Sequence, residues 1–103
     1  MRMHVILWRF RVRPGREAEF EAAYGDEGTW ALFFRSGEGF VGTELMRGTD
    51  GTYLTIDRWV SRSAQQAFRD ANARRYAELD AAGLALTIEE ALVAEVEAYA
   101  HMG

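Results

Sequence analysis

A period of two in side-chain character, found near both ends of the chain, constrains the fold more than any other feature of the sequence. Residues 3–12 alternate between two registers, one rich in aromatic side chains and the other ending in arginines. Residues 91–99 alternate in the same way, with small apolar residues in one register and glutamates in the other. Because successive side chains of a β-strand point to opposite faces, both segments are predicted to be strands.

The segments between these two strands alternate between helical and extended patterns. Residues 16–24 carry apolar side chains at helical spacing and acidic residues in the first turn, and residues 30–35 predict a short second helical piece. Strands are predicted over 40–47 and 53–60, joined by a turn at 48–51. Ser61 or Ser63 is expected to cap a kinked helix that runs to Gly83, and residues 84–89 form a connector. The order β-α-β-β-α-β predicts an α+β ferredoxin-like sandwich with an antiparallel sheet.

Length and composition limit the chain to a few classes of protein. Its 103 residues suffice for one domain, spanning 1–103, and 49% apolar with 27% charged residues is typical of a globular chain without membrane spans. A net charge of −4 argues against nucleic-acid binding, and the lack of cysteine excludes disulfides and thiolate chemistry. Because the N-terminal segment resembles a strand and not a signal peptide, we expect a cytoplasmic protein.

The helices of this fold cover one face of the sheet, so each strand register must be assigned to a face. The apolar registers are expected to face the helices: Ile6, Trp8, Phe10, Val12, Val41, Leu45, Leu54, Ile56, Leu92, Ala94 and Val96. The remaining registers are expected on the open face: Val5, Leu7, Arg9, Arg11, Phe40, Glu44, Met46, Tyr53, Thr55, Asp57, Trp59, Val93, Glu95, Glu97 and Tyr99. Large aromatic side chains on an open face favour a homodimer that encloses a cavity between two sheets.

Candidate site residues follow from that assignment. Asp57 is the candidate general base in an aromatic pocket, with Arg9 and Tyr53 as catalytic partners. The candidate substrate-binding residues lie on the same predicted face or near it: Trp59, Trp30, Phe40, Glu95 and Tyr99. An ion pair between Asp57 and Arg9 without any chemistry, and aromatic residues that only fill a dimer seam, stay open as alternatives.

The sequence offers no metal or nucleotide motif. His4 and His101 lie near opposite ends of the chain, and no pair of histidines has ligand spacing. No glycine-rich phosphate loop follows a strand, and no histidine lies where it could activate a serine nucleophile. We therefore expect no metal, haem or flavin cofactor.

The ordered set of motifs resembles the antibiotic biosynthesis monooxygenase-like family of dimeric α/β barrels. The resemblance spans nearly the whole chain and is carried by four segments: Phe10–Gly15 with Glu17 and Phe20, Gly28–Phe33, Gly39–Leu45, and Tyr53–Trp59 with Ser61, Ala64 and Phe68. Haem-degrading relatives carry Asn, Trp and His at positions that here hold Trp8, Phe68 and Glu78, so haem breakdown is not expected.

What the resemblance implies is a homodimer with small-molecule pockets. Family members include monooxygenases that use neither metal nor flavin and oxidise aromatic polyketides or quinols. Such an activity needs a dry aromatic pocket and a group that favours the substrate anion. Two classes remain open at this point: a cofactor-independent monooxygenase, and a non-catalytic dimeric barrel that binds a small molecule or serves a stress-related role.

Overall fold

The computed structural model of the chain describes residues 2–99. His101, which was considered as a metal ligand together with His4, lies outside the described residues. The elements follow the predicted order: β1 (Arg2–Val12), α1 (Glu17–Tyr24), α2 (Thr29–Phe34), β2 (Phe40–Arg47), β3 (Tyr53–Trp59), α3 (Arg62–Ala71), α4 (Ala73–Leu84) and β4 (Thr87–Tyr99). The last strand begins earlier than expected, because the last residues of the predicted connector, Thr87 and Glu89, already pair with β1.

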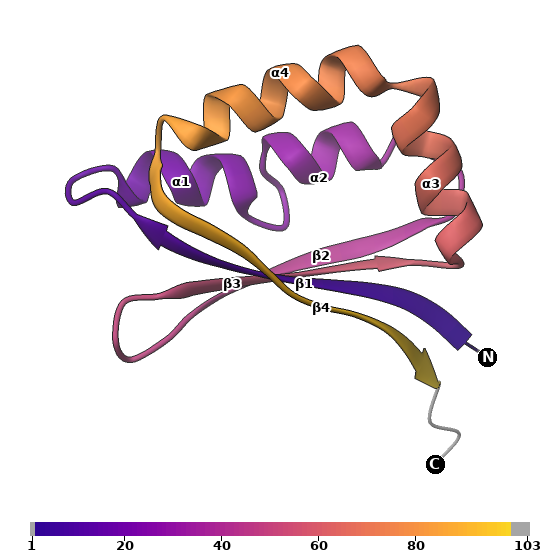
Figure 1. Ribbon diagram of the computed structural model, residues 1–103, viewed down its shortest axis with the longest axis horizontal. Helices are drawn as coiled ribbons and strands as arrows, with labels where there is room; N and C mark the ends of the chain where they lie inside the picture. Colours follow the sequence, from indigo (N-terminus) through magenta and orange to yellow (C-terminus); the bar gives the residue numbers. More distant parts are fainter. Residues whose placement is uncertain (1, 100–103) are drawn as a thin grey trace.

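The four strands form one antiparallel sheet in the order β2-β3-β1-β4. The helices all lie on one side of this sheet, and its other side carries none of the helices or strands within residues 2–99 (Figure 1). This is the arrangement of a ferredoxin-like α+β fold, and the predicted fold class is confirmed.

Local chemistry at the element ends accounts for several boundaries. The Ser61 hydroxyl accepts a hydrogen bond from the Ala64 backbone N–H at 3.0 Å, which caps the start of α3. The predicted kink lies at Asn72, which separates α3 from α4. In the β2–β3 turn, Gly51 has a φ of 86°, a backbone conformation that glycine adopts without steric cost.

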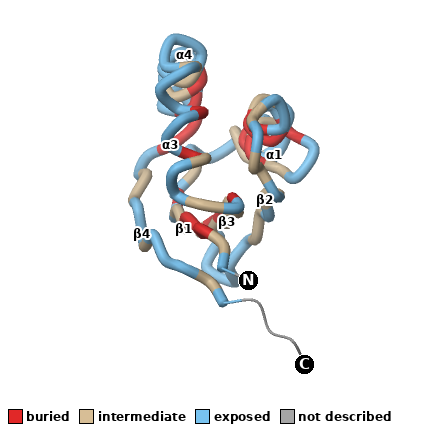
Figure 2. Tube along the Cα trace, turned by 90° about the vertical axis from the view of Figure 1, so that its right-hand side faces the viewer, coloured by how far each residue is buried: buried red, intermediate tan, exposed pale blue. Residues whose placement is uncertain are grey.

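The core between sheet and helices is built of aromatic rings. The largest fully buried side chains are Phe10, Phe20, Tyr53 and Trp59, which come from both layers. Phe20 stacks on Tyr24 with ring centroids 4.3 Å apart. Figure 2 shows the buried stretches on the helices and on the central strands β1 and β3, while β4 is mostly exposed.

Strand β3 lies in the register opposite to the predicted one. Tyr53 and Trp59 are each 1% exposed and belong to the core, and Thr55 and Asp57 share their face toward the helices. Leu54 and Ile56 therefore point to the open face, against the prediction. Aromatic side chains bury more surface than aliphatic ones, so the register that places both rings inside is the more stable.

The outer strands deviate from the predicted registers because each contains an irregularity. In β4 the pairing shifts after Leu92, so Glu95 pairs with Ile6 on the helix side, and Ala94 and Val96 pair with residues of the open face. In β2 a shift at Val41 leaves that residue 50% exposed. Phe40 packs on Trp59 with centroids 5.2 Å apart instead of facing outward.

Candidate active site

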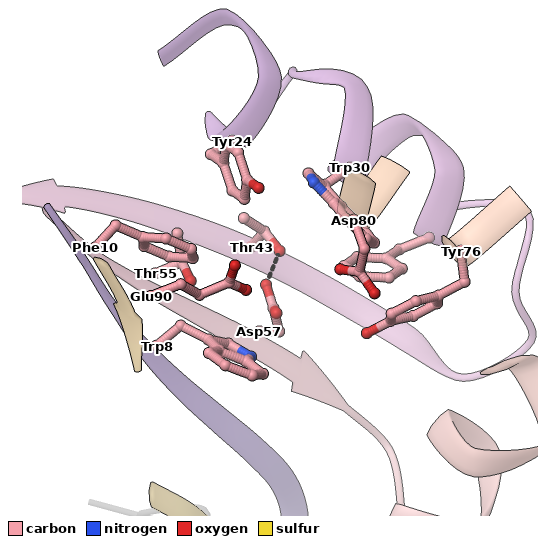
Figure 3. A pocket seen from close by; sticks show the side chains of 11 residues that line it. Trp8, Phe10, Tyr24, Trp30, Thr43, Thr55, Asp57, Tyr76, Asp80 and Glu90 are labelled. Carbon is pink, nitrogen blue, oxygen red and sulfur yellow. Dashed lines mark hydrogen bonds between the residues drawn. The ribbon is translucent and has the colours of Figure 1, made fainter. Parts of the chain in front are cut away.

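A cavity lies between the sheet and the helices of the single chain. The cavity predicted from the sequence lies elsewhere, between the two sheets of a homodimer. The space between its lining side chains, open mouth included, is about 400 Å³. Its walls come from every strand and from three of the helices: Trp8, Phe10, Tyr24, Trp30, Phe34, Thr43, Thr55, Asp57, Tyr76, Asp80 and Glu90. Figure 3 shows most of these side chains from close by.

Polar groups from opposite walls converge on this cavity. Asp57 from β3 and Glu90 from β4 extend their carboxyl groups from the sheet, and Asp80 extends one from α4 (Figure 3). The hydroxyl groups of Tyr24 and Tyr76 point toward the same space. The arrangement combines aromatic walls with several separated carboxyl and phenol groups, which suits an aromatic ligand with polar substituents.

Asp57 is the carboxyl group whose environment departs most from water. Thr43 on the neighbouring strand β2 donates a hydrogen bond from Oγ1 to Asp57 Oδ1 at 2.5 Å. Removal from water raises the pKa of Asp57 to about 6, and the Thr43 bond opposes that rise only in part. A carboxylate with a pKa near the working pH is suited to accept a proton from a substrate and to release it again.

The other ionisable groups of the cavity are perturbed in the same direction. Burial raises the pKa of Asp80 against the opposing charge of Arg69, and burial together with the charge of Asp80 raises the pKa of Glu90. Burial also raises the pKa of Tyr24 and of Tyr76 to about 12, so both phenols are neutral hydrogen-bond donors at physiological pH.

A second hollow continues from the cavity past Asp57 toward α3. It shares Trp8, Phe34, Asp57 and Tyr76 with the first and is completed by Ile6, Trp59, Gln65, Arg69, Leu92 and Glu95. Glu95 lies 3.3 Å from His4 Nε2, and the Arg69 guanidinium lies over the Tyr76 ring at 4.8 Å from its centroid. This hollow is therefore mixed in charge, whereas the first cavity is acidic.

Two of the three residues predicted to be catalytic lie away from the cavity. Arg9 is on the open face of the sheet, where it pairs with Glu89 at 3.0 Å, so it cannot reach Asp57 through the sheet. The Tyr53 hydroxyl donates a hydrogen bond to Glu21 on α1. Only Asp57 is a cavity residue: Arg9 lies on the opposite face of the sheet, and Tyr53 shares the face of Asp57 but is buried in the core beside α1.

The predicted substrate-binding residues are also dispersed. Trp30 lines the cavity, and Trp59 and Glu95 line the adjoining hollow. Phe40 packs in the core against Trp59. Tyr99 is 69% exposed and lies beneath the Arg2 guanidinium at the end of β4.

Several cavity residues were not singled out from the sequence. Tyr76 and Asp80 are four residues apart on α4, a spacing that places both on one helix face and could have indicated their proximity. Glu90 falls between the predicted connector at 84–89 and the predicted strand at 91–99, and Thr43 is recognisable only once β2 and β3 are paired in the observed register. Tyr24 was treated as a core residue of α1, which it also is.

The described residues form neither a metal-binding cluster nor a membrane-spanning helix. Within residues 2–99, no group of three or more His, Cys, Asp or Glu side chains is placed to hold a metal ion. Nor does any described helix combine the length and hydrophobicity that crossing a bilayer requires.

Comparison with solved structures shows which proteins share this architecture. SnoaB from Streptomyces nogalater, a cofactor-independent oxygenase, is 26% identical with a TM-score of 0.73, and the match covers 99% of this chain and 98% of SnoaB. The NE2512 protein of unknown function from Nitrosomonas europaea is 20% identical, with a TM-score of 0.70 over 98% of this chain and 93% of that one. Rv0793 from Mycobacterium tuberculosis is 19% identical, with a TM-score of 0.66 over 98% and 97%. The last two likenesses concern the fold alone.

The sequence itself was compared with curated proteins and with family models. No curated protein gives a significant match. The family model described as antibiotic biosynthesis monooxygenase matches residues 3–78, which include β1, the cavity residues of β2 and β3, and the first part of α4. The chain thus belongs to the antibiotic biosynthesis monooxygenase family, as its sequence motifs suggested.

Proposed function

We propose that the protein is a cofactor-independent monooxygenase that oxidises a small aromatic, polyketide or quinol-like substrate in the cavity beside Asp57. The observation that carries the proposal is a carboxylate with a pKa of about 6, held by Thr43 and surrounded by aromatic rings. The likeness to SnoaB, a cofactor-independent oxygenase at 26% identity, supports the same class of reaction.

The chemistry requires a substrate that supplies all the electrons itself. Asp57 accepts a proton from an activated C–H or phenolic O–H group, and the resulting anion is electron-rich enough to reduce O2. For a ring CH2 group, four electrons pass to O2, one oxygen atom remains as a carbonyl, and the other leaves as water with the two hydrogens. Aromatic walls exclude bulk water and hold the planar ring, so the protein's part is to position the substrate and move the proton.

Oxygen uptake with a panel of anthrones and quinols tests this proposal. We expect one or more panel members to be oxidised faster with the protein than in buffer, without added metal or flavin. Asp57→Asn should reduce that rate roughly 10²–10⁴-fold, the usual contribution of a general base. Rates that equal the buffer control for the whole panel, or a variant as active as the native chain, would refute the assignment.

The open face of the sheet supports a further part of the proposal, a homodimer. Cross-strand neighbours at its centre are aliphatic: Leu7 pairs with Ile56 on one side and Ala94 on the other. Charged pairs flank this centre, such as Arg58 on β3 with Glu44 on the edge strand β2 at 3.0 Å. An apolar centre with a polar rim is typical of protein–protein interfaces, and members of the family are typically dimeric.

A single substitution tests the dimer. Leu7→Arg places a charge between aliphatic neighbours and should shift the protein from dimer to monomer, because burying an unpaired guanidinium at an interface is costly. Leu32→Arg on α2, an exposed leucine on the helical side, is the matched control and should leave the mass unchanged. Light scattering at micromolar concentration measures both, and a native chain that is monomeric would refute the proposal.

A further inference from the structure

The walls of the cavity carry only one sign of charge. Its ionisable lining residues are the carboxylic acids Asp57, Asp80 and Glu90 and two tyrosines, and no basic side chain is among the described lining residues. The basic group of the adjoining hollow, Arg69, rests on the Tyr76 ring. Its charge acts on Asp80 from that neighbouring hollow and partly lowers the pKa of this carboxyl group, but no basic side chain among the described residues lines the cavity itself.

The three carboxyl groups also surround the space instead of lying together. They come from β3, α4 and β4, and Figure 3 shows them directed into the cavity from different sides. Among the lining residues in Figure 3 only one hydrogen bond is drawn, from Thr43 to Asp57, so the carboxyl groups of Asp80 and Glu90 are available to a ligand. Trp8, Phe10 and Trp30 provide the flat apolar walls between them.

We infer that Asp80 and Glu90 determine specificity by charge, so that the cavity admits neutral or cationic aromatic molecules with hydrogen-bond donors and rejects aromatic anions of the same shape. The inference rests on the proposed function in one respect, since it takes this cavity as the substrate site. It concerns the substrate class and assigns roles to two residues that take no part in the proton transfer.

Electrostatics of a partly desolvated site support this selectivity. The carboxylates of the cavity repel an anionic ligand more strongly than they would in water, because the effective dielectric constant there is lower. A neutral phenol or an ammonium group can instead donate hydrogen bonds to the carboxylates. The proposed reaction is compatible with such walls, because moving a proton from a neutral substrate to Asp57 leaves the total charge of the cavity unchanged. A substrate that entered as an anion would add to it.

Three naphthalene probes of similar shape test the inference in the native protein. The probes are 2-naphthylmethylammonium, 2-naphthalenemethanol and 2-naphthoate, titrated at pH 7 by isothermal calorimetry. We expect the cation and the alcohol to bind at least roughly tenfold more tightly than the anion, a difference that corresponds to about 1.4 kcal/mol. Equal affinities, tighter binding of naphthoate, or no binding of any probe at millimolar concentration would each overturn the inference.

Variants separate the local effect from the overall negative charge of the protein. In the Asp80→Asn and Glu90→Gln double variant, the preference against naphthoate should fall to within about threefold. Asp70→Asn changes the net charge on the exposed surface of α3, where Asp70 accepts a hydrogen bond from Gln66, and should retain the full preference. A preference that persists in the double variant would refute the assignment to these two residues. Thermal melts verify folding, and the single Asp80→Asn variant serves if the double variant does not fold.

The oxygen-uptake assay keeps this inference separate from the proposed function. A protein that shows the charge preference but oxidises no anthrone or quinol retains the selectivity and loses the monooxygenase assignment. A protein that oxidises a panel member but binds all three probes alike retains the monooxygenase assignment and loses the charge selectivity.

Discussion

Replacing Asp57 with Asn should make the folded protein more stable while it slows the proposed oxidation. The substitution keeps the shape of the side chain, and the Asn oxygen can still accept the Thr43 hydrogen bond. The structure raises the pKa of Asp57 from 3.8 to about 6 by removing it from water. At about 1.36 kcal/mol per pKa unit, the ionised carboxylate costs the fold on the order of 3 kcal/mol, and less where solvent reaches its exposed part.

The sign of the pH dependence follows from proton linkage. Between about pH 4 and pH 6 the folded chain still holds the Asp57 proton and the unfolded chain has lost it, so raising the pH through this window favours unfolding. The destabilisation by Asp57 is absent below the pKa that this group has in the unfolded chain. It is complete above the pKa that the group has in the folded chain. Asp57→Asn should therefore equal the native chain near pH 4 and exceed it in stability by about 1–3 kcal/mol at pH 7.5.

Urea denaturation at both pH values, at one protein concentration, measures this difference, and oxygen uptake on the same samples measures the rate. For a chain of this length, each kcal/mol also corresponds to a rise of roughly 4–8 °C in Tm. A variant less stable than the native chain at pH 7.5 would show that the Asp57 carboxylate makes a favourable pairing. A stability difference of the same size at both pH values would contradict the desolvation of this group.

Three further substitutions test individual contacts. Thr43→Val removes the hydrogen bond that lowers the pKa of Asp57, so the acidic limb of the pH–rate profile should move to higher pH; an unchanged profile would separate this contact from catalysis. Ser61→Ala removes the cap of α3 and should cost about 1 kcal/mol in urea denaturation, whereas a cost near zero would show that water replaces the hydroxyl. Gly83→Ala would place a Cβ 2.0 Å from the Tyr24 hydroxyl oxygen, so we expect a net loss of stability although alanine favours helices by about 1 kcal/mol; a more stable variant would mean that the tyrosine moves aside freely.

The order of elements was predictable from the sequence because the hydrophobic periodicity and the turn and capping residues indicate the same boundaries along the chain. The turn at Gly48–Gly51, the cap at Ser61 and the kink before α4 each have local chemical signatures, and the observed boundaries follow them. The choice of sheet face was not predictable in the same way. In β3 both registers contain large apolar side chains, so alternation alone does not distinguish Tyr53 and Trp59 from Leu54 and Ile56.

The candidate site was predictable only to the extent that it depends on residue type. A lone carboxylate between aromatic residues, Asp57, indicated a perturbed group, and it is indeed a cavity residue with a raised pKa. Its surroundings depend on tertiary packing. Asp80 reaches the cavity from a helix that crosses over the sheet, and Glu90 reaches it because β4 begins earlier than its pattern suggested. The periodicity of a single sequence does not predict such tertiary contacts.

The strand register that buries the Asp57 carboxylate, and so destabilises the fold, also holds this side chain in the cavity. Tyr53 and Trp59, on either side of it in β3, are each 1% exposed, and burying an aromatic side chain contributes roughly 2–3 kcal/mol. Turning Asp57 toward water by a one-residue slip would expose both rings, since every side chain of the strand would change face. Leu54 and Ile56 would turn inward in exchange, but Arg58 would turn inward with them. Burying an unpaired guanidinium costs several kcal/mol, more than the roughly 3 kcal/mol of the carboxylate. A desolvated carboxylate is therefore stable in this fold because its own strand anchors it, and no cation is needed at its side.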